Sequence, residues 1–265
     1  MLRLNGMKVN ISHFPDGTLL IKQGFLTSGN SGNATIDWRY ESDEEVFTLY
    51  CLTRHLQRHG YAVNLFMPYI PHARMDRVKS TEDVFTLKYF AEIINSLNFR
   101  LVTVLDPHSS VSEALINNLR IVDPATYIAK ALGKIGNPKK LMLFYPDEGA
   151  MKRYSGMIKA PYAFGVKNRD WQTGNILSLE VMGEKESVKG RNILIVDDIC
   201  SRGGTFFYAA KALKELGAKK IYLYVTHCEK TILEGELLTS GLIEKVFTTN
   251  SICTVEHEKV EVIDL

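Results

Sequence analysis

The stretch that decides the fold is ILIVDDICSRGGT, residues 193–205. It opens with four apolar residues, a short run typical of a buried strand in a parallel sheet. Two carboxylates, Asp197 and Asp198, follow directly, and a segment with two glycines and a threonine leads into a predicted helix over residues 205–216. Amides at a helix N-terminus suit a phosphate, and adjacent carboxylates can accept hydrogen bonds from vicinal sugar hydroxyls. The stretch therefore predicts a sugar-phosphate site at the carboxyl end of a strand.

Strand-like and helix-like segments alternate on both sides of this stretch. The other apolar runs that indicate buried strands, covered on both faces, lie at residues 61–66, 101–105, 141–144 and 221–225. Capping-box residues Ser42 and Glu45 predict the start of a helix that ends at Gly60, and a second helix is predicted over residues 82–97. The pattern predicts an α/β fold in two halves that divide near residue 120.

Composition excludes several classes of protein. The chain has 265 residues, 45% hydrophobic and 23% charged, with a net charge of +2, which argues against a strongly basic nucleic-acid binder. Its four cysteines are far apart without a CxxC pair, so we expect free thiols in a reducing compartment. No apolar run suits a bilayer span and no signal peptide is evident. We therefore expect a cytoplasmic protein that binds neither nucleic acid nor membrane.

Two further strand ends carry acidic groups. Asp106-Pro107-His108 follows the run at 101–105, and Pro146-Asp147 follows the run at 141–144. Any one of these acids could cap a helix or stabilise a turn. Three strand ends with acids together favour one shared polar site. The stretch 28–34, in contrast, is rich in Gly, Asn and Ser and predicts a mobile loop. The absence of a helix-opening GxGxxG argues against a phosphate-binding loop there.

Several motifs, in order, carry a family resemblance. The 193–205 stretch resembles the phosphoribosyl-diphosphate loop of type I phosphoribosyltransferase folds, and PYIPHARMDR at 68–77 resembles a segment found in ribose-phosphate diphosphokinases (PRPP synthetases). Shorter matches are FPDG at 14–17, DPH at 106–108, PDEG at 146–149, KNR at 167–169, TH at 226–227 and TNS at 249–251. The chain is identified as a short, divergent member of this family, since both ends look trimmed against the family pattern.

The resemblance implies an architecture and a reaction. The fold would be two tandem type I phosphoribosyltransferase-like domains, residues 1–120 on the ATP side and residues 121–265 with the ribose-phosphate loop. Each would contain a mostly parallel sheet flanked by helices. The reaction would be the Mg²⁺-dependent transfer of the β,γ-diphosphate of ATP to the anomeric hydroxyl of ribose 5-phosphate. The partners would be these substrates and further copies of the chain, in a homo-oligomer.

The resemblance also implies roles for individual residues. Contacts to ATP would come from Phe14, Asp16, Arg74, Asp76, Arg77 and His108. The pair that stabilises the transferred diphosphate would be Lys167 and Arg169, at the start of a catalytic flexible loop in the second domain. The ribose and its phosphate would be held by Asp197, Asp198, Ser201, Arg202, Gly203, Gly204 and Thr205. Magnesium would be held by His108 and Asp147; a histidine is an unusual contact for this hard cation.

One departure leaves the acceptor open. Where the family usually has DTGGT after the two acids, this chain has Ser201-Arg202-Gly203-Gly204-Thr205, which loses an acid and gains a cation. That change suits a tightly bound 5-phosphate, and equally a 5-substituent with more negative charge, such as the diphosphate of ADP-ribose, which would place the protein in NAD salvage. A phosphoribosyltransferase and an inactive regulatory paralogue are weaker alternatives, because ARMDR and the expected catalytic and metal-binding residues are present.

Overall fold

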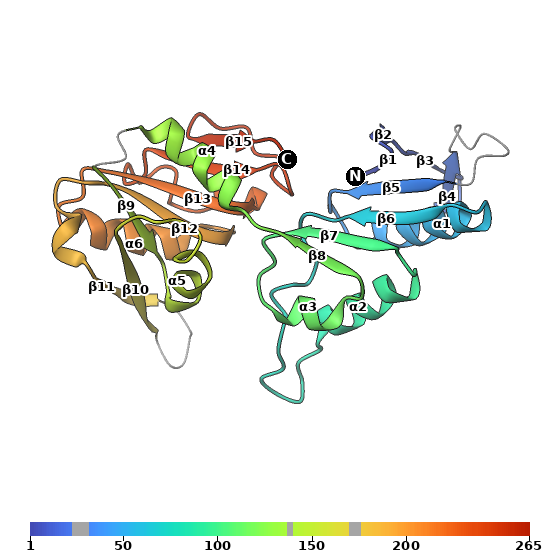
Figure 1. Ribbon diagram of the computed structural model, residues 1–265, viewed down its shortest axis with the longest axis horizontal. Helices are drawn as coiled ribbons and strands as arrows, with labels where there is room; N and C mark the ends of the chain where they lie inside the picture. Colours follow the sequence, from blue (N-terminus) through green and yellow to red (C-terminus); the bar gives the residue numbers. More distant parts are fainter. Residues whose placement is uncertain (23–31, 137–139, 170–175) are drawn as a thin grey trace. The chain divides into compact units, whose positions relative to one another are not determined.

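The structure, a computed structural model, describes residues 1–22, 32–136, 140–169 and 176–265, with the backbone alone at 167–169 and 176–178. The chain divides into two compact units, Met1–Asp123 and Pro124–Leu265 (Figure 1). The boundary expected near residue 120 falls inside a strand, β8 (Leu119–Val122), which completes the first unit. Each unit is a mixed α/β structure with a mostly parallel sheet, so the predicted fold class is confirmed.

The second unit is built on a seven-stranded sheet. Its strands lie in the order β11-β10-β9-β12-β13-β14-β15, and every neighbouring pair is parallel except β10 with β11. Their bounds are β9 Leu141–Tyr145, β10 Tyr162–Arg169, β11 Ile176–Gly183, β12 Asn192–Cys200, β13 Lys220–Cys228, β14 Lys245–Thr249 and β15 Val260–Ile263. The chain enters this sheet at β9, in its interior, and adds strands on both sides.

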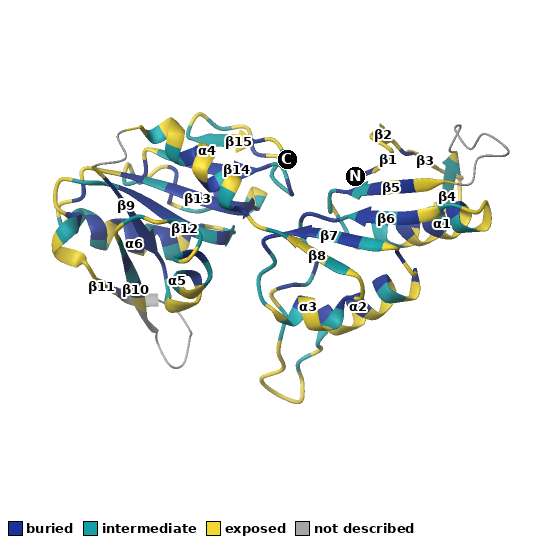
Figure 2. Cartoon of the chain, in the orientation of Figure 1, coloured by how far each residue is buried: buried dark blue, intermediate teal, exposed yellow. Residues whose placement is uncertain are grey.

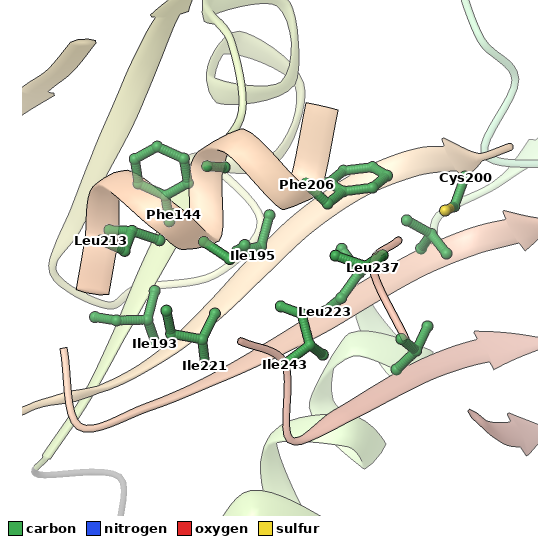
Figure 3. Close-up of a cluster of buried hydrophobic side chains, with 14 of the residues drawn as sticks. Phe144, Ile193, Ile195, Cys200, Phe206, Leu213, Ile221, Leu223, Leu237 and Ile243 are labelled. Carbon is green, nitrogen blue, oxygen red and sulfur yellow. The ribbon is translucent and has the colours of Figure 1, made fainter. Parts of the chain in front are cut away.

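Helices cover both faces of this sheet because its central strands are apolar on both sides. Along β12, Ile193 and Ile195 face one hydrophobic cluster while Leu194 and Val196 face the other. Helix α6 (Gly204–Glu215) packs on the first face, where Figure 3 shows its side chains against those of β9, β12 and β13. Helices α4 (Ala125–Ile135) and α5 (Glu148–Tyr154) pack on the second face. Two short 3-10 helices, η2 (Lys185–Val188) and η3 (Lys230–Glu234), lie in connections.

The first unit contains a six-stranded sheet in the order β2-β1-β5-β6-β7-β8. Strands β5 to β8 are parallel, and the edge strands β1 and β2 are antiparallel. Their bounds are β1 Leu2–Leu4, β2 Met7–Lys8, β5 Asn33–Trp38, β6 Ala62–Phe66 and β7 Leu101–Leu105. A separate hairpin pairs β3 (Asn10–His13) with β4 (Leu19–Lys22). Helices α1 (Glu45–Arg58), α2 (Thr86–Ser96) and α3 (Val111–Leu115) complete the unit.

Burial in the first unit alternates along its strands. In β5, Ala34, Ile36 and Trp38 are buried, whereas Asn33 and Thr35 are exposed (Figure 2). The buried side packs with apolar residues of α1 and α2 in one cluster. The expectation that the run at 61–66 is covered on both faces is therefore wrong for this sheet, because the polar residues of its strands alternate onto a more open face.

Four details differ from the sequence expectations. The helix expected from Ser42 begins at Glu45 instead, because the carboxylate of Glu45 binds the indole of Trp38 and the backbone of Glu41 and does not cap the helix. Helix α2 begins at Thr86, not at residue 82. Residues 33 and 34, expected in a loop, begin β5, while residues 28–31 lie outside the described part. Strands β12 and β13 both run several residues beyond their apolar cores.

Two further observations concern the whole of the described chain. The cysteines Cys51, Cys200, Cys228 and Cys253 are free thiols. Within the described ranges, no helix combines the length and the apolarity needed to cross a membrane.

Candidate functional site

Strand β12 carries the two predicted ribose-binding carboxylates within its length. Its pairing with β13 continues through Asp197, Ile199 and Cys200, so the acids belong to an extended strand and not to the loop that follows it. The backbone amide of Asp198 donates a hydrogen bond of 3.0 Å to Oδ1 of Asp197. The strand therefore fixes the backbone of both acids before any ligand binds.

A third carboxylate lies close to this pair. Asp147 follows β9, the parallel neighbour of β12, and caps α5 by accepting a 2.9 Å hydrogen bond from the amide of Ala150. Burial raises the pKa of the Asp197 carboxyl well above its usual value, and the negative charges of Asp198 and Asp147 raise it further. The carboxyl ends of β9 and β12 therefore bring together three acids that sequence reasoning assigned to one polar site.

Arg153 balances part of this negative charge. It lies at the C-terminal end of α5, and its Nη1 is 3.5 Å from Oδ2 of Asp198. Sequence reasoning did not select Arg153, because nothing in the local pattern links the sixth residue after Asp147 to a strand far along the chain. Only the packing of α5 beside β12 brings the two charges together.

The segment after β12 has the geometry of an anion site. Gly203 adopts a left-handed conformation, with φ of 78°, and precedes α6 as its N-cap. The first helical hydrogen bond runs from the amide of Phe207 to the carbonyl of Gly203 at 2.9 Å, so the preceding amides have no acceptor within the helix. A Cβ built on Gly204 would meet nothing within 4 Å, which leaves open space for a ligand at the helix start. The helix dipole favours an anion there.

The altered residue of this segment, Arg202, is already paired. Its Nη2 lies 3.1 Å from Oε2 of Glu234 in η3, and its Nε donates to the same oxygen at 3.2 Å. Both side chains are exposed, 74% and 56% respectively. Glu234 is a second residue that sequence reasoning missed, and its carboxylate offsets the cation that distinguishes this loop from the family pattern.

The predicted adenine-side residues form the turn of the β3–β4 hairpin in the first unit. Oδ1 of Asp16 accepts hydrogen bonds from the amide of Thr18 at 3.0 Å and from its hydroxyl at 2.7 Å, which lowers the pKa of the Asp16 carboxyl. Asp16 thus shapes the turn, with Gly17 at a φ of 84°. The Phe14 ring, 48% exposed, is presented at this tip.

The other predicted ATP contacts follow β6 and β7. The carbonyl of Pro68 accepts from the amide of Leu105 at 3.0 Å, so the 68–77 segment leaves the sheet beside the residues that lead to His108. Arg74 and Arg77 are exposed, Asp76 and His108 are half-buried, and Arg77 lies 3.9 Å from Asp76. These residues thus follow the carboxyl edge of the first unit's sheet, as predicted.

The predicted catalytic pair lies in a strand. Lys167 and Arg169 belong to β10, whose backbone pairs antiparallel with β11, and the ladder shifts register between Asn168 and Arg169. The resemblance placed them at the start of a loop; the strand instead continues through Arg169. Their side chains lie outside what the structure describes.

The acids at the ends of β9 and β12 suit a magnesium ion that is shared with substrate phosphates and water. Among the described residues, no three His, Cys, Asp or Glu side chains are grouped closely enough to hold a metal ion by themselves. Mg²⁺, however, usually binds through one or two carboxylates together with substrate phosphates and water. The acids at the ends of β9 and β12 fit such a shared ion, which would reduce the repulsion between them.

Comparisons with known proteins agree with this geometry. The family described as "Phosphoribosyl synthetase-associated domain" matches residues 177–265. The chain is 29% identical to a ribose-phosphate pyrophosphokinase of Thermococcus kodakarensis over 256 residues, which cover 94% of this chain and 87% of the relative. It is 28% identical to the Pyrococcus abyssi enzyme of the same name, over 98% of this chain and 89% of the relative.

A solved structure extends the likeness to the fold of both units. The crystal structure of phosphoribosylpyrophosphate synthetase from Mycobacterium smegmatis superposes with a TM-score of 0.80 at 18% identity, covering 97% of this chain and 86% of that one. The predicted resemblance is thus confirmed: over nearly its whole length, the chain is similar to ribose-phosphate pyrophosphokinases (PRPP synthetases), which are diphosphotransferases.

Proposed function

We propose that this protein transfers the β,γ-diphosphate of ATP to the anomeric hydroxyl of ribose 5-phosphate, giving AMP and phosphoribosyl diphosphate. One observation carries the proposal: half-buried Asp197 and buried Asp198 are followed, within five residues, by left-handed Gly203 and the open start of α6. This arrangement supplies acceptors for sugar hydroxyls beside donors for a phosphate. The names of the relatives support the same reaction.

The reaction itself asks for positioning and charge neutralisation. The anomeric oxygen of the sugar forms a bond to the β-phosphorus of ATP, while the bond from that phosphorus to the oxygen shared with the α-phosphate breaks. AMP leaves with that oxygen, and the proton of the hydroxyl passes to water. Asp197 and Asp198 would accept hydrogen bonds from the ribose 2- and 3-hydroxyls as the amides of α6 bind the 5-phosphate. A sugar held at both ends has its anomeric oxygen oriented for attack.

Magnesium is part of the proposal. When bound, it would neutralise phosphate charge and favour attack at phosphorus. Asp147 would contribute a carboxylate oxygen to it from the start of α5. Within the first unit, His108, which follows β7, would contact a magnesium ion.

The remaining proposed roles concern contacts to ATP and to the transferred diphosphate. The ring of Phe14 would contact the adenine, with Asp16 holding the turn that presents it. The guanidinium groups of Arg74 and Arg77 are exposed and suited to bidentate phosphate contacts. Lys167 and Arg169, in β10, would stabilise the charge on the transferred diphosphate.

The ion pair of Arg202 bears on the alternative acceptor. The cation gained by the loop would suit the extra negative charge of ADP-ribose, but that cation is already paired with Glu234. A larger acceptor would therefore have to draw Arg202 away from Glu234, whereas ribose 5-phosphate leaves the pair intact. Ribose 5-phosphate is therefore the favoured acceptor. We expect Arg202→Thr to change kcat/KM for ribose 5-phosphate less than about threefold, because exposed ion pairs contribute little.

The test is AMP formation from ATP and Mg²⁺ by the purified protein, with ribose 5-phosphate and with ADP-ribose in parallel. We expect turnover with ribose 5-phosphate, and none after chelation of the metal. Turnover with ADP-ribose alone would reject the proposed acceptor. Diphosphate release from phosphoribosyl diphosphate with a nucleobase and without ATP would indicate a phosphoribosyltransferase, and inactivity in every arm would indicate a regulatory paralogue.

A further inference from the structure

We propose that Arg153 is a positioning residue for the ribose-binding diacid: its guanidinium holds the Asp198 carboxylate in the orientation that receives a sugar hydroxyl. The inference rests on the proposed function and deepens it. It adds to the site a residue that does not touch the reacting atoms and acts through Asp198.

The position of Arg153 is defined by contacts on more than one side. Its Nη1 lies 3.5 Å from Oδ2 of Asp198 and 3.5 Å from the hydroxyl oxygen of Tyr154. Its Cζ lies 5.6 Å from the centre of the Tyr154 ring, a cation–π distance. Tyr154 is fully buried and stacks on Tyr145, with ring centres 6.4 Å apart. The guanidinium is thereby held against a rigid aromatic surface.

Burial strengthens the ion pair between Arg153 and Asp198. The side chain of Asp198 is 6% exposed and that of Arg153 is 26% exposed. A charge pair shielded from water interacts more strongly than a surface pair, and an unpaired buried carboxylate is costly. Lys152, the preceding residue, offers a contrast, because its ion pair with Glu148 at 3.2 Å has both side chains about two-thirds exposed.

Helix α5 places opposite charges beside the two members of the diacid. Asp147 at its start is close enough to Asp197 for their charges to interact, while Arg153 at its end pairs with Asp198. The two ends of one short helix therefore each contribute a charge beside one of the two acids. Because Asp198 already has a fixed backbone in β12, its pairing with Arg153 restricts the remaining freedom, the rotation of its side chain.

The experiment is a double-mutant cycle on the full chain, with Arg153→Met, Asp198→Asn and the combination. Methionine keeps an unbranched apolar stem over Tyr154 and removes the charge. We expect Arg153→Met to lower kcat/KM for ribose 5-phosphate about 10- to 100-fold, mostly through KM, as expected when one partner of a desolvated charge pair is removed. The KM for ATP should change less than about twofold. In the Asp198→Asn background the same substitution should change kcat/KM less than about threefold.

Two further variants separate positioning from structure. Arg153→Lys keeps the charge and should show a smaller loss of kcat/KM than Arg153→Met. If Arg153→Met fails to fold, Arg153→Lys takes its place in the cycle with that smaller expected loss. Lys152→Met removes the neighbouring exposed cation and should leave every kinetic constant unchanged. Circular dichroism and thermal unfolding of each variant show whether the fold is retained.

The outcomes distinguish this inference from the proposed function. Absence of AMP formation by the wild-type protein with ribose 5-phosphate would refute the proposed function before any variant is measured. An active wild type with independent, multiplicative effects of Arg153→Met and Asp198→Asn would overturn the role of Arg153 alone. An equal rise in the KM for ATP and for ribose 5-phosphate would overturn it as well, because a positioning role through Asp198 is specific to the sugar.

Discussion

Replacement of Gly203 by alanine tests most directly the geometry of the segment between β12 and α6. The residue has a φ of 78°, and a Cβ built there would lie 2.9 Å from Cδ2 and 3.0 Å from Cβ of Leu237. The left-handed conformation costs a non-glycine residue about 1–2 kcal/mol. Leu237 is fully buried in the cluster beneath α6, so overpacking against it adds about 1–3 kcal/mol. The expected loss in the free energy of unfolding is therefore about 2–5 kcal/mol.

The assay is urea unfolding followed by circular dichroism, supported by calorimetry. At roughly 3 °C per kcal/mol, the unfolding temperature should fall by roughly 6–15 °C. Gly204→Ala is the matched control, because that position has open space and begins the helix. It should leave stability unchanged or raise it by about 0.4–1 kcal/mol, while it weakens ribose 5-phosphate binding. Equal stabilities of the two variants would refute the reasoning.

Three further predictions concern the same unit. Gly235→Ala should lower turnover with ribose 5-phosphate, measured by AMP release, because its Cβ would overlap the carbonyl oxygen of Arg202; unchanged kinetics would contradict this. Asp197→Asn should raise the unfolding temperature in metal-free buffer at pH 7. The raised pKa of Asp197 means that the folded state binds more protons than the unfolded state above pH 4, so wild-type stability falls as the pH rises through the folded pKa. The higher unfolding temperature of Asp197→Asn should disappear at pH 3. A rise in unfolding temperature that is independent of pH would contradict a raised pKa of Asp197 as its cause. Lys167→Ala should lower kcat about 100- to 1,000-fold with an unchanged unfolding temperature, and unchanged turnover would remove this residue from catalysis.

The sequence predicted the elements whose signals are local. The apolar run of β12, its two acids and the glycines before α6 lie together in the chain, and the structure keeps them in that order. The extension of β12 to Cys200 depends on the pairing of Cys200 with Cys228 of β13. No local sequence pattern indicates this pairing. The start of α1 was misplaced for a similar reason, since Glu45 is engaged by Trp38 from a neighbouring strand.

The parts of the site that sequence reasoning missed are long-range contacts. In the sequence, nothing distinguishes Arg153 from other cations near the end of a short helix. Its ion pair with Asp198 forms only because α5 packs beside β12. In the sequence, nothing distinguishes Glu234 from other surface acids. Its pairing with Arg202 depends on the position of η3 against the loop that contains Arg202. In both cases the chemistry lies in a pair, and only one member of each pair belongs to a recognisable motif.

The order of strands in the second unit has a consequence for how the protein folds. Asp147 follows β9 and Asp197 lies in β12, which are neighbours in the sheet although β10 and β11 intervene in the chain. The β10–β11 pair is a local antiparallel ladder and can form early. The pairing of β9 with β12 forms only after β12 has been made and a long loop has closed. In a chain emerging from the ribosome, the proposed sugar-phosphate site would therefore form late, with the slowest contacts. Refolding measured by ribose 5-phosphate binding should lag behind refolding measured by secondary structure.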